Sequence, residues 1–228
     1  MHVAALVLAA GRGERLGAGV PKALLSLAGR PLLAHAIEAI AACAAIETII
    51  PVVPEAERAR CAALVRALDA GPRVREPVAG GDERQDSMVA GLAALPPGVE
   101  LVAVHDAARP LVGAAEVERV VAAARRHGAA LLAVPLRDTL KRVVGGCVVE
   151  TLPRAACWAA QTPQVFRVEL LREAIAKAAA DGFQGTDDAQ LVERLGVPVH
   201  VVEGDPRNLK VTWPADLALA EALLAGRT

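Results

Sequence analysis

Short apolar runs alternate along this chain with stretches in which apolar residues recur at helical spacing. A short apolar run is typical of a buried strand, whereas apolar residues three and four positions apart indicate one face of a helix. The runs predict strands over residues 3–8, 46–53, 73–76, 101–104, 129–134 and 197–202. The helical spacing predicts helices over residues 31–42, 55–68, 116–127, 168–180 and 215–224, with shorter ones from Asp86 or Ser87 to 95 and from the Gly185-Thr186-Asp187-Asp188 cap to 195. This alternation predicts a doubly wound, mostly parallel α/β sheet of the Rossmann-like type.

The alternation breaks at Pro135. Residues 139–144 and 147–152 predict two strands joined by a turn at Gly145-Gly146, and no helix follows. A lone hairpin is only marginally stable in water, so it needs a surface to pack on. We expect residues 136–160 to form a β-hairpin dimerisation arm in a homodimer. The alternative is a hairpin that folds back onto its own domain.

The carboxyl ends of the predicted parallel strands are the expected place for a ligand. The loops after Leu8, Val74 and Val104 would all open on that edge of the sheet. The first loop belongs to the stretch VAALVLAAGRGERLGAGVPK at residues 3–22, where a strand runs into small residues, glycines and three cations. Free backbone N–H groups and cations suit a polyphosphate. The alternative is a glycine-rich turn whose arginines are only solvated.

Two common phosphate loops do not match this stretch. Lys22 lies between Pro21 and Ala23, so the P-loop pattern fails. Leu16 stands where the dinucleotide-binding fingerprint requires its third glycine, which disfavours an NAD(P)-dependent dehydrogenase.

Composition and charge narrow the class of protein. The chain of 228 residues has 25 basic and 26 acidic residues, which gives no overall field for nucleic acid or an anionic membrane. Only two tryptophans and two phenylalanines are present, too few for stacking on single-stranded nucleic acid. No apolar run reaches the ~18–20 residues of a membrane span, and we expect no signal peptide. The four cysteines lie far apart, which favours neither zinc nor disulfides and fits the cytoplasm.

Six further segments carry a family resemblance. They read GGDERQDS at 80–87, VHDAARP at 104–110, RDTLKR at 137–142, TPQVF at 162–166, TDDA at 186–189 and NLKVT at 208–212. Together with the first loop they resemble, in order and nearly end to end, the 2-C-methyl-D-erythritol 4-phosphate cytidylyltransferases of the nucleotidyltransferase superfamily and the non-mevalonate isoprenoid pathway. Ala23 replaces the glutamine that is usual after PK, and Asp188 replaces a usual glutamate. With no linker or repeat, residues 1–228 are expected to form one nucleotidyltransferase domain.

The resemblance implies a transferase reaction. A phosphate oxygen of 2-C-methyl-D-erythritol 4-phosphate would attack the α-phosphorus of CTP, giving 4-diphosphocytidyl-2-C-methyl-D-erythritol and pyrophosphate. A phosphate monoester has a second pKa near ~6, so this nucleophile needs no general base, and His105 is interpreted as structural. Mg²⁺ or another divalent cation would be bound mainly by the CTP phosphates, with Asp106 as a candidate protein ligand.

Site residues follow from the positions that match the family. The residues expected to be catalytic are Arg15, Lys22, Arg154 and Lys210, with Arg15 and Lys22 stabilising the transition state and Lys210 holding the acceptor phosphate. Arg154 is expected to reach the acceptor across the dimer interface, as are Arg109 and Thr139. The expected substrate-binding residues are Ala9, Ala10, Gly11, Arg12, Gly13, Gly81, Asp82, Ser87, Asp106, Ala107, Arg109, Thr139, Thr162 and Thr186.

Two other functions use the same motifs. A pentitol-phosphate cytidylyltransferase acting on ribitol phosphate would share the CTP residues and differ in its acceptor pocket. A non-catalytic CTP-binding regulator would keep the fold, although the presence of Arg15 and Lys22 disfavours it.

Overall fold

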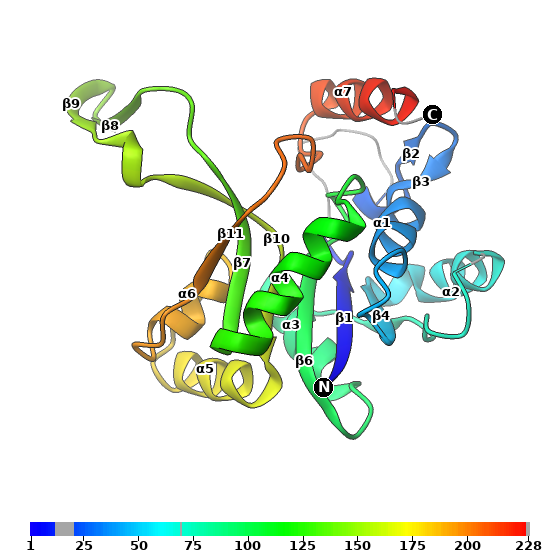
Figure 1. The fold of residues 1–228 in the computed structure, drawn as a ribbon. Coiled ribbons are helices and arrows are strands. Elements are labelled where there is room, and N and C mark those ends of the chain that lie inside the picture. Colours follow the sequence, from blue (N-terminus) through cyan, green and yellow to red (C-terminus); the bar gives the residue numbers. More distant parts are fainter. Residues whose placement is uncertain (12–20, 69, 227–228) are drawn as a thin grey trace.

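The computed structural model describes residues 1–11, 21–68 and 70–226, which form a central sheet with helices on both faces (Figure 1). Within these residues the sheet has seven strands in the order β11-β7-β10-β6-β1-β4-β5. The strands are β1 (His2–Leu8), β4 (Thr48–Val53), β5 (Val78–Ala79), β6 (Val99–Asp106), β7 (Ala129–Pro135), β10 (Trp158–Arg167) and β11 (His200–Glu203). All neighbouring pairs are parallel except those of β10, which runs antiparallel to both β6 and β7. The predicted doubly wound, mostly parallel sheet is confirmed.

Alternating side chains of the strands build two hydrophobic cores. Val3, Ala5 and Val7 of β1 face α1 (Leu32–Ala41), α2 (Arg58–Ala67) and α4 (Ala114–His127). Leu6 and Leu8 face the other core, which is covered by α3 (Arg84–Ala93), α5 (Val168–Ala180) and α6 (Asp188–Glu193). Because both faces are buried, β1 is apolar from Val3 to Leu8 rather than alternating with polar residues.

A third apolar cluster lies beside the sheet. It joins α7 (Pro214–Ala225) to the small ribbon of β2 (Ser26–Leu27) and β3 (Arg30–Pro31), through Leu27 and Ala220 among others. Short 3-10 turns, η2 (Lys22–Leu24), η3 (Glu55–Glu57) and η4 (Arg154–Ala156), complete the elements. No helix within the described ranges is long and apolar enough to cross a membrane.

Strand β10 is the main element that the sequence pattern did not predict. Its middle reads Gln161-Thr162-Pro163-Gln164, a polar stretch with a proline, which is unusual inside a sheet. These polar side chains are nevertheless buried. The pairing of β10 with β7 runs to Ala160, shifts, and resumes at Gln164, so Pro163 lies in the gap where no ladder hydrogen bond is needed.

Several boundaries differ from the prediction for local reasons. Residues 73–76 are not a strand, since Val74 makes only an isolated bridge to Ile49 and β5 supplies the edge strand. The helix expected to be capped by Asp86 or Ser87 instead has Glu83 as its cap and begins at Arg84, because Asp86 accepts the backbone N–H of Glu83 at 3.2 Å in a capping box. The helix expected over 55–68 divides into η3 and α2, and the last strand begins only at His200.

The predicted hairpin forms with nearly the predicted strands. Among the described residues, β8 (Leu140–Val144) pairs only with β9 (Cys147–Leu152), and in Figure 1 the pair lies away from the central sheet. Gly145 and Gly146 both have positive φ, +57° and +80°, as a two-residue hairpin turn favours. The valines of both strands are about half exposed, Val144 and Val148 at 59 % each. Whether a second subunit covers them stays a prediction.

The side chain of Arg73 anchors the segment that failed to form a strand. Its guanidinium donates to the carbonyl oxygen of Ala41, the last residue of α1, at 2.7 Å, and to those of Ile46 and Cys43, just past the helix, at 2.9 and 3.3 Å. A carbonyl at the end of a helix lacks a partner within the helix, and a cation there is favoured by the dipole.

We therefore expect Arg73→Met to lower the free energy of unfolding by roughly 1.5–3 kcal/mol, the usual range for hydrogen bonds to a charged group. Urea unfolding followed by circular dichroism measures this loss. Arg75→Met, two residues on and exposed, is the matched control. Equal losses in the two variants would contradict the anchoring role.

Candidate functional site

A cavity of about 480 Å³ opens at the carboxyl ends of β1 and β6. It is bounded by the loop after β1, the loop before α3, the first turn of α3, the loop after β6 and the tail before α7. Its lining residues are Leu8, Ala9, Ala10, Gly11, Lys22, Ala23, Gly81, Asp82, Glu83, Arg84, Ser87, Asp106, Ala107, Ala108, Lys210 and Thr212. The three loops predicted to share one edge of the sheet therefore surround one cavity. The loop predicted to follow Val74 instead follows β5.

The cavity brings together most of the residues predicted from the sequence. Ten of them line it, namely Ala9, Ala10, Gly11, Lys22, Gly81, Asp82, Ser87, Asp106, Ala107 and Lys210. Arg12, Gly13 and Arg15 lie outside the described residues. Five others do not line it, namely Arg109, Thr139, Arg154, Thr162 and Thr186.

Close backbone packing shapes the cavity floor. The N–H of Ala9 donates to Val52 O at 2.7 Å, and the N–H of Ala107 donates to Leu8 O at 2.9 Å, so the loops continue the sheet pairing. A Cβ on Gly80 would lie 2.6 Å from the Ser87 hydroxyl oxygen and 2.7 Å from the Ala10 Cβ. Only glycine fits between these two loops. The amino end of α3 also faces the cavity, and the partial positive charge of a helix N-terminus favours an anionic ligand.

Asp106, at the end of β6, is paired with two cations. Arg84 Nε lies 3.2 Å from its Oδ1, and Lys210 Nζ lies 2.7 Å from its Oδ2. Burial alone would raise the pKa of Asp106, but the charges of Arg84, Lys210 and Arg109 outweigh it and hold the pKa well below its usual range. Asp106 is therefore a carboxylate in this structure.

Arg84 is a site residue that the sequence reasoning missed. Its two terminal nitrogens donate to Asp188 at 2.6 and 2.8 Å, while its Nε faces Asp106. Burial would lower the pKa of Arg84, but the neighbouring Asp188 and Asp106 carboxylates raise it overall. The available signal was its place in GGDER, next to the predicted Asp82. The lining residues Leu8, Glu83, Ala108 and Thr212 were also not predicted, whereas Ala23 was noted only as a departure from the family pattern.

His105 and Thr162 form a buried hydrogen-bonded chain behind Asp106. His105 Nε2 lies 3.0 Å from Arg109 O, which can only accept, so this nitrogen carries the proton. Thr162 Oγ1 then donates to His105 Nδ1 at 3.0 Å and accepts the backbone N–H of Asp106 at 3.0 Å. Burial lowers the pKa of His105 to about 4. A neutral histidine with both nitrogens engaged supports the interpretation that it is structural.

The tail that carries Lys210 is fixed from several sides. Arg109 donates to Asn208 O at 2.8 Å and to Ala160 O at 3.1 Å. Asn208 Nδ2 donates to Thr162 O at 3.0 Å, and the N–H of Val211 donates to Ala108 O at 2.8 Å. Arg109 thus holds the protein's own tail in this structure, and its predicted substrate contact stays a prediction.

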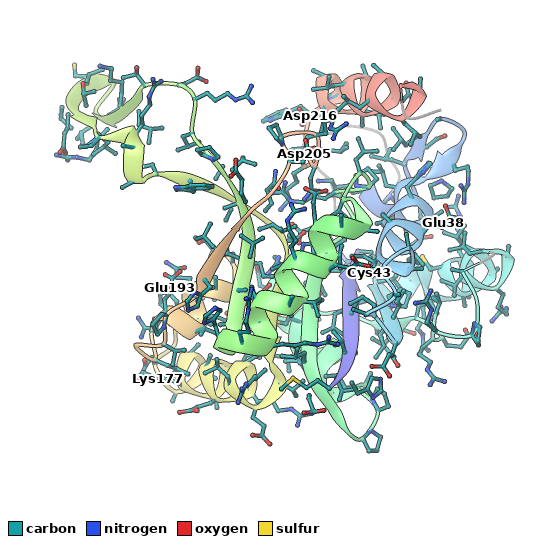
Figure 2. The ribbon with its side chains drawn as sticks, viewed as in Figure 1. Glu38, Cys43, Lys177, Glu193, Asp205 and Asp216 are labelled. Atoms are coloured by element: carbon teal, nitrogen blue, oxygen red, sulfur yellow. The ribbon has the colours of Figure 1, made fainter. Side chains whose placement is uncertain are left out.

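Two carboxylates also fix the ends of this tail, and Figure 2 labels both. Asp205 Oδ1 accepts the N–H of Arg207 at 2.7 Å. Asp216, in the first turn of α7, accepts the N–H groups of Thr212 and Trp213 at 2.8 Å each. Lys210 therefore projects from a segment whose backbone is restrained before and after it.

The remaining predicted residues lie elsewhere. Thr139 and Arg154 are exposed beside the hairpin, and the Arg154 side chain donates to Arg137 O. Thr186 is exposed, and its N–H donates to the Gln190 side chain at 2.8 Å. Among the residues described, no group of three or more His, Cys, Asp or Glu side chains could hold a metal ion.

Comparison with known proteins identifies relatives over the full length. The family model described as 2-C-methyl-D-erythritol 4-phosphate cytidylyltransferase matches residues 3–226. A protein of that name from Geotalea uraniireducens is 47 % identical over 226 residues, covering 98 % of this chain and 97 % of its own length. One from Geobacillus kaustophilus is 45 % identical over 230 residues, covering 100 % and 99 %.

Solved structures agree with these relatives. The crystal structure of 4-diphosphocytidyl-2C-methyl-D-erythritol synthase from Anaerococcus prevotii matches with a TM-score of 0.86 at 30 % identity, over 98 % of both chains. That of 2-C-methyl-D-erythritol 4-phosphate cytidylyltransferase from Thermus thermophilus matches with a TM-score of 0.80 at 37 % identity, over 99 % of this chain and 100 % of that one.

The neutral, buried His105 makes folding stability depend on pH. Its pKa of about 4 lies below the ordinary value, so as pH falls below 6.5 the unfolded chain takes up a proton that the folded chain does not. We expect the free energy of unfolding to fall between pH 6.5 and 4, by at most about 1.4 kcal/mol per pH unit from this group. Below its folded pKa, the loss from this group is complete.

Urea unfolding at pH 6.5, 5.5 and 4.5 measures the effect, with His105→Gln as the comparison. The variant is expected to lose less stability with falling pH than the wild type, whatever its absolute stability. Parallel pH slopes for the two proteins would contradict a neutral His105.

Proposed function

The chain belongs to the 2-C-methyl-D-erythritol 4-phosphate cytidylyltransferase family, and from that premise we propose that its cavity condenses CTP with 2-C-methyl-D-erythritol 4-phosphate. The products are 4-diphosphocytidyl-2-C-methyl-D-erythritol and pyrophosphate, in isoprenoid precursor synthesis. The observation that carries the proposal is the family match from residue 3 to residue 226, with Lys22 and Lys210 lining one cavity. The enzyme is a nucleotidyltransferase that acts on soluble small molecules, and we place it in the cytoplasm.

The reaction forms one bond and breaks one. A phosphate oxygen of the acceptor bonds to the α-phosphorus of CTP, and the bond from that phosphorus to the bridging oxygen breaks, so pyrophosphate leaves with its electron pair. The acceptor phosphate is largely ionised at neutral pH and needs no base. This fits a site in which the nearby histidine is neutral and fully engaged in hydrogen bonds.

Bringing two polyanions together is the main difficulty, and the cationic side chains address it. Lys22 neutralises charge that develops on the α-phosphoryl oxygens, and Lys210 binds the acceptor phosphate. The N–H groups near Gly11 and the amino end of α3 bind the triphosphate. Arg12, Gly13 and Arg15, outside the described residues, belong to the same phosphate loop by their place in the motif.

Base selection falls to the loop before α3. Cytosine presents an amino donor beside acceptors, so backbone carbonyls and a hydroxyl can read its edge. Gly81, Asp82 and Ser87 line the cavity on this side. The narrow space at Gly80 fixes that loop against Ala10, which keeps the base pocket and the phosphate loop in one relative position.

The donor groups in the cavity suit Mg²⁺. This ion prefers oxygen ligands and commonly keeps one or two carboxylates together with substrate phosphates. Asp106 lines the cavity as a carboxylate, and each of its oxygens keeps a second lone pair beside the cation that it contacts. When bound, Mg²⁺ would neutralise triphosphate charge, with Asp106 as the protein residue that holds it.

The hairpin completes the site from a second subunit. Thr139 and Arg154 are exposed and do not line the cavity of their own chain. The half-exposed valines of β8 and β9 offer an apolar surface for a homodimer, in which Arg154 of one chain reaches the acceptor in the other.

A pyrophosphate-release assay tests the reaction. We expect turnover with CTP, Mg²⁺ and 2-C-methyl-D-erythritol 4-phosphate, and loss of it when EDTA removes the metal. Preference for ribitol phosphate would instead identify a pentitol-phosphate cytidylyltransferase. CTP binding with no turnover on any polyol phosphate would favour a regulator and overturn the proposal.

Mixing two inactive variants tests the shared site. Lys22→Ala and Arg154→Ala homodimers should each be impaired, but in a mixed dimer one of the two sites has both residues intact. Random mixing makes about half the dimers mixed, so activity should recover to about a quarter of the wild-type value. Native mass spectrometry confirms that mixed dimers form. No recovery in confirmed mixed dimers would indicate self-contained sites.

A further inference from the structure

Four side chains of alternating charge run from the interior to the cavity. Asp188 pairs with Arg84, Arg84 with Asp106, and Asp106 with Lys210. Asp106 and Lys210 have proposed roles in the reaction, whereas the proposed mechanism gives no role to the Asp188–Arg84 pair. We propose that Asp188, acting through Arg84, is a positioning residue that keeps Asp106 paired and in place while Lys210 moves from Asp106 to the acceptor phosphate. This inference rests on the proposed function.

The geometry makes the Asp188–Arg84 pair rigid. Both residues begin helices, α6 and α3, and are 104 positions apart in the sequence. The Asp188 side chain is 2 % exposed and receives both terminal nitrogens of Arg84 in a bidentate pair. This pair leaves Nε as the guanidinium donor that reaches Asp106. A planar guanidinium can serve two carboxylates in fixed directions, which a lysine ammonium cannot do.

The charges around Asp106 explain why this pair matters for binding. In the present structure the ammonium of Lys210 is bound to Asp106 at 2.7 Å, so it must exchange partners to bind a phosphate. The Asp106 side chain is only 11 % exposed, and a buried carboxylate without a cation is strongly unfavourable. Arg84 remains beside Asp106 after the exchange, so release of Lys210 leaves no unpaired buried charge.

The charge of Asp188 keeps the two terminal guanidinium nitrogens of Arg84 directed at Asp188 rather than at Asp106. Without a charged partner on α6, the two terminal nitrogens of Arg84 would turn to the nearest carboxylate, Asp106. That shift would displace Asp106 from its position opposite Lys210. Because Asp106 would also hold Mg²⁺ on the triphosphate, the kinetics are compared at saturating Mg²⁺. Under that condition the effect should fall on the acceptor, which Lys210 binds, more than on CTP.

Steady-state kinetics on the full-length protein test this role, with each substrate varied in turn. Asp188→Asn keeps the shape and removes the charge, so it should raise KM for the acceptor about tenfold, as loss of an outer support commonly does. KM for CTP should stay within about twofold of the wild type. Asp188→Glu, which restores both oxygens, should recover most of the acceptor affinity.

Asp187→Asn is the matched control. Its carboxylate caps the same helix by accepting the N–H of Gln190 at 3.0 Å, and it also accepts from Gln164 at 2.9 Å, but it does not bind Arg84. This variant should lower the melting temperature without changing either KM. If Asp188→Asn behaves like Asp187→Asn, or raises both KM values equally, Asp188 is only structural and the inference is wrong.

Should Asp188→Asn fail to fold, Arg84→Lys retains the charge but loses the fork, and the same selective rise in acceptor KM is expected. An unchanged acceptor KM in that variant would also overturn the inference. A wild type without turnover would refute the proposed function itself, which is a different result from normal turnover with no KM split.

Discussion

The position of the Asp106 carboxylate between two cations is the constraint on which the site depends. Arg84 comes from the start of α3 and Lys210 from the tail before α7, while Asp106 ends a central strand. Three segments distant in sequence therefore meet at one carboxylate. Because positive and negative side chains alternate, each group stabilises the ionised form of its neighbour. The carboxylate between Arg84 and Lys210 also offsets the repulsion between these two cations. A cavity intended for polyanions can in this way be stable before any polyanion is bound.

Much of the fold and part of the site were predictable from local sequence. Apolar runs predicted the parallel strands other than β5, and the Gly145-Gly146 pair predicted the hairpin turn, because both signals lie within a few residues. Lys22 and Lys210 were predicted as site residues because they belong to motifs that match the family, and both line the cavity. Strand β10 was missed because its buried centre is polar, and the side chains of Gln161 and Gln164 find hydrogen-bond partners far away in sequence.

The Arg84–Asp188 pair illustrates what local patterns cannot supply. Each residue lies in a recognisable motif, yet nothing in either motif indicates that the two side chains meet. Ion pairs between distant segments leave no periodicity or turn signature. Arg109 illustrates the same point, since the family resemblance implied a substrate contact and gave no sign that its guanidinium also holds the backbone of the tail. Roles of charged residues depend on tertiary contacts that spacing does not encode.

The break in the pairing of β10 affects how the segment that carries Lys210 is held. A regular strand would have committed its carbonyl groups to the neighbouring ladder. Here residues 161–163 fall between the paired stretches that end at Ala160 and resume at Gln164, and the carbonyl of Thr162 is open to the Asn208 amide. The irregularity thus provides a hydrogen-bond acceptor for the C-terminal segment. A regular strand at this point would pair more completely with its neighbour but would leave the segment that carries Lys210 without this contact.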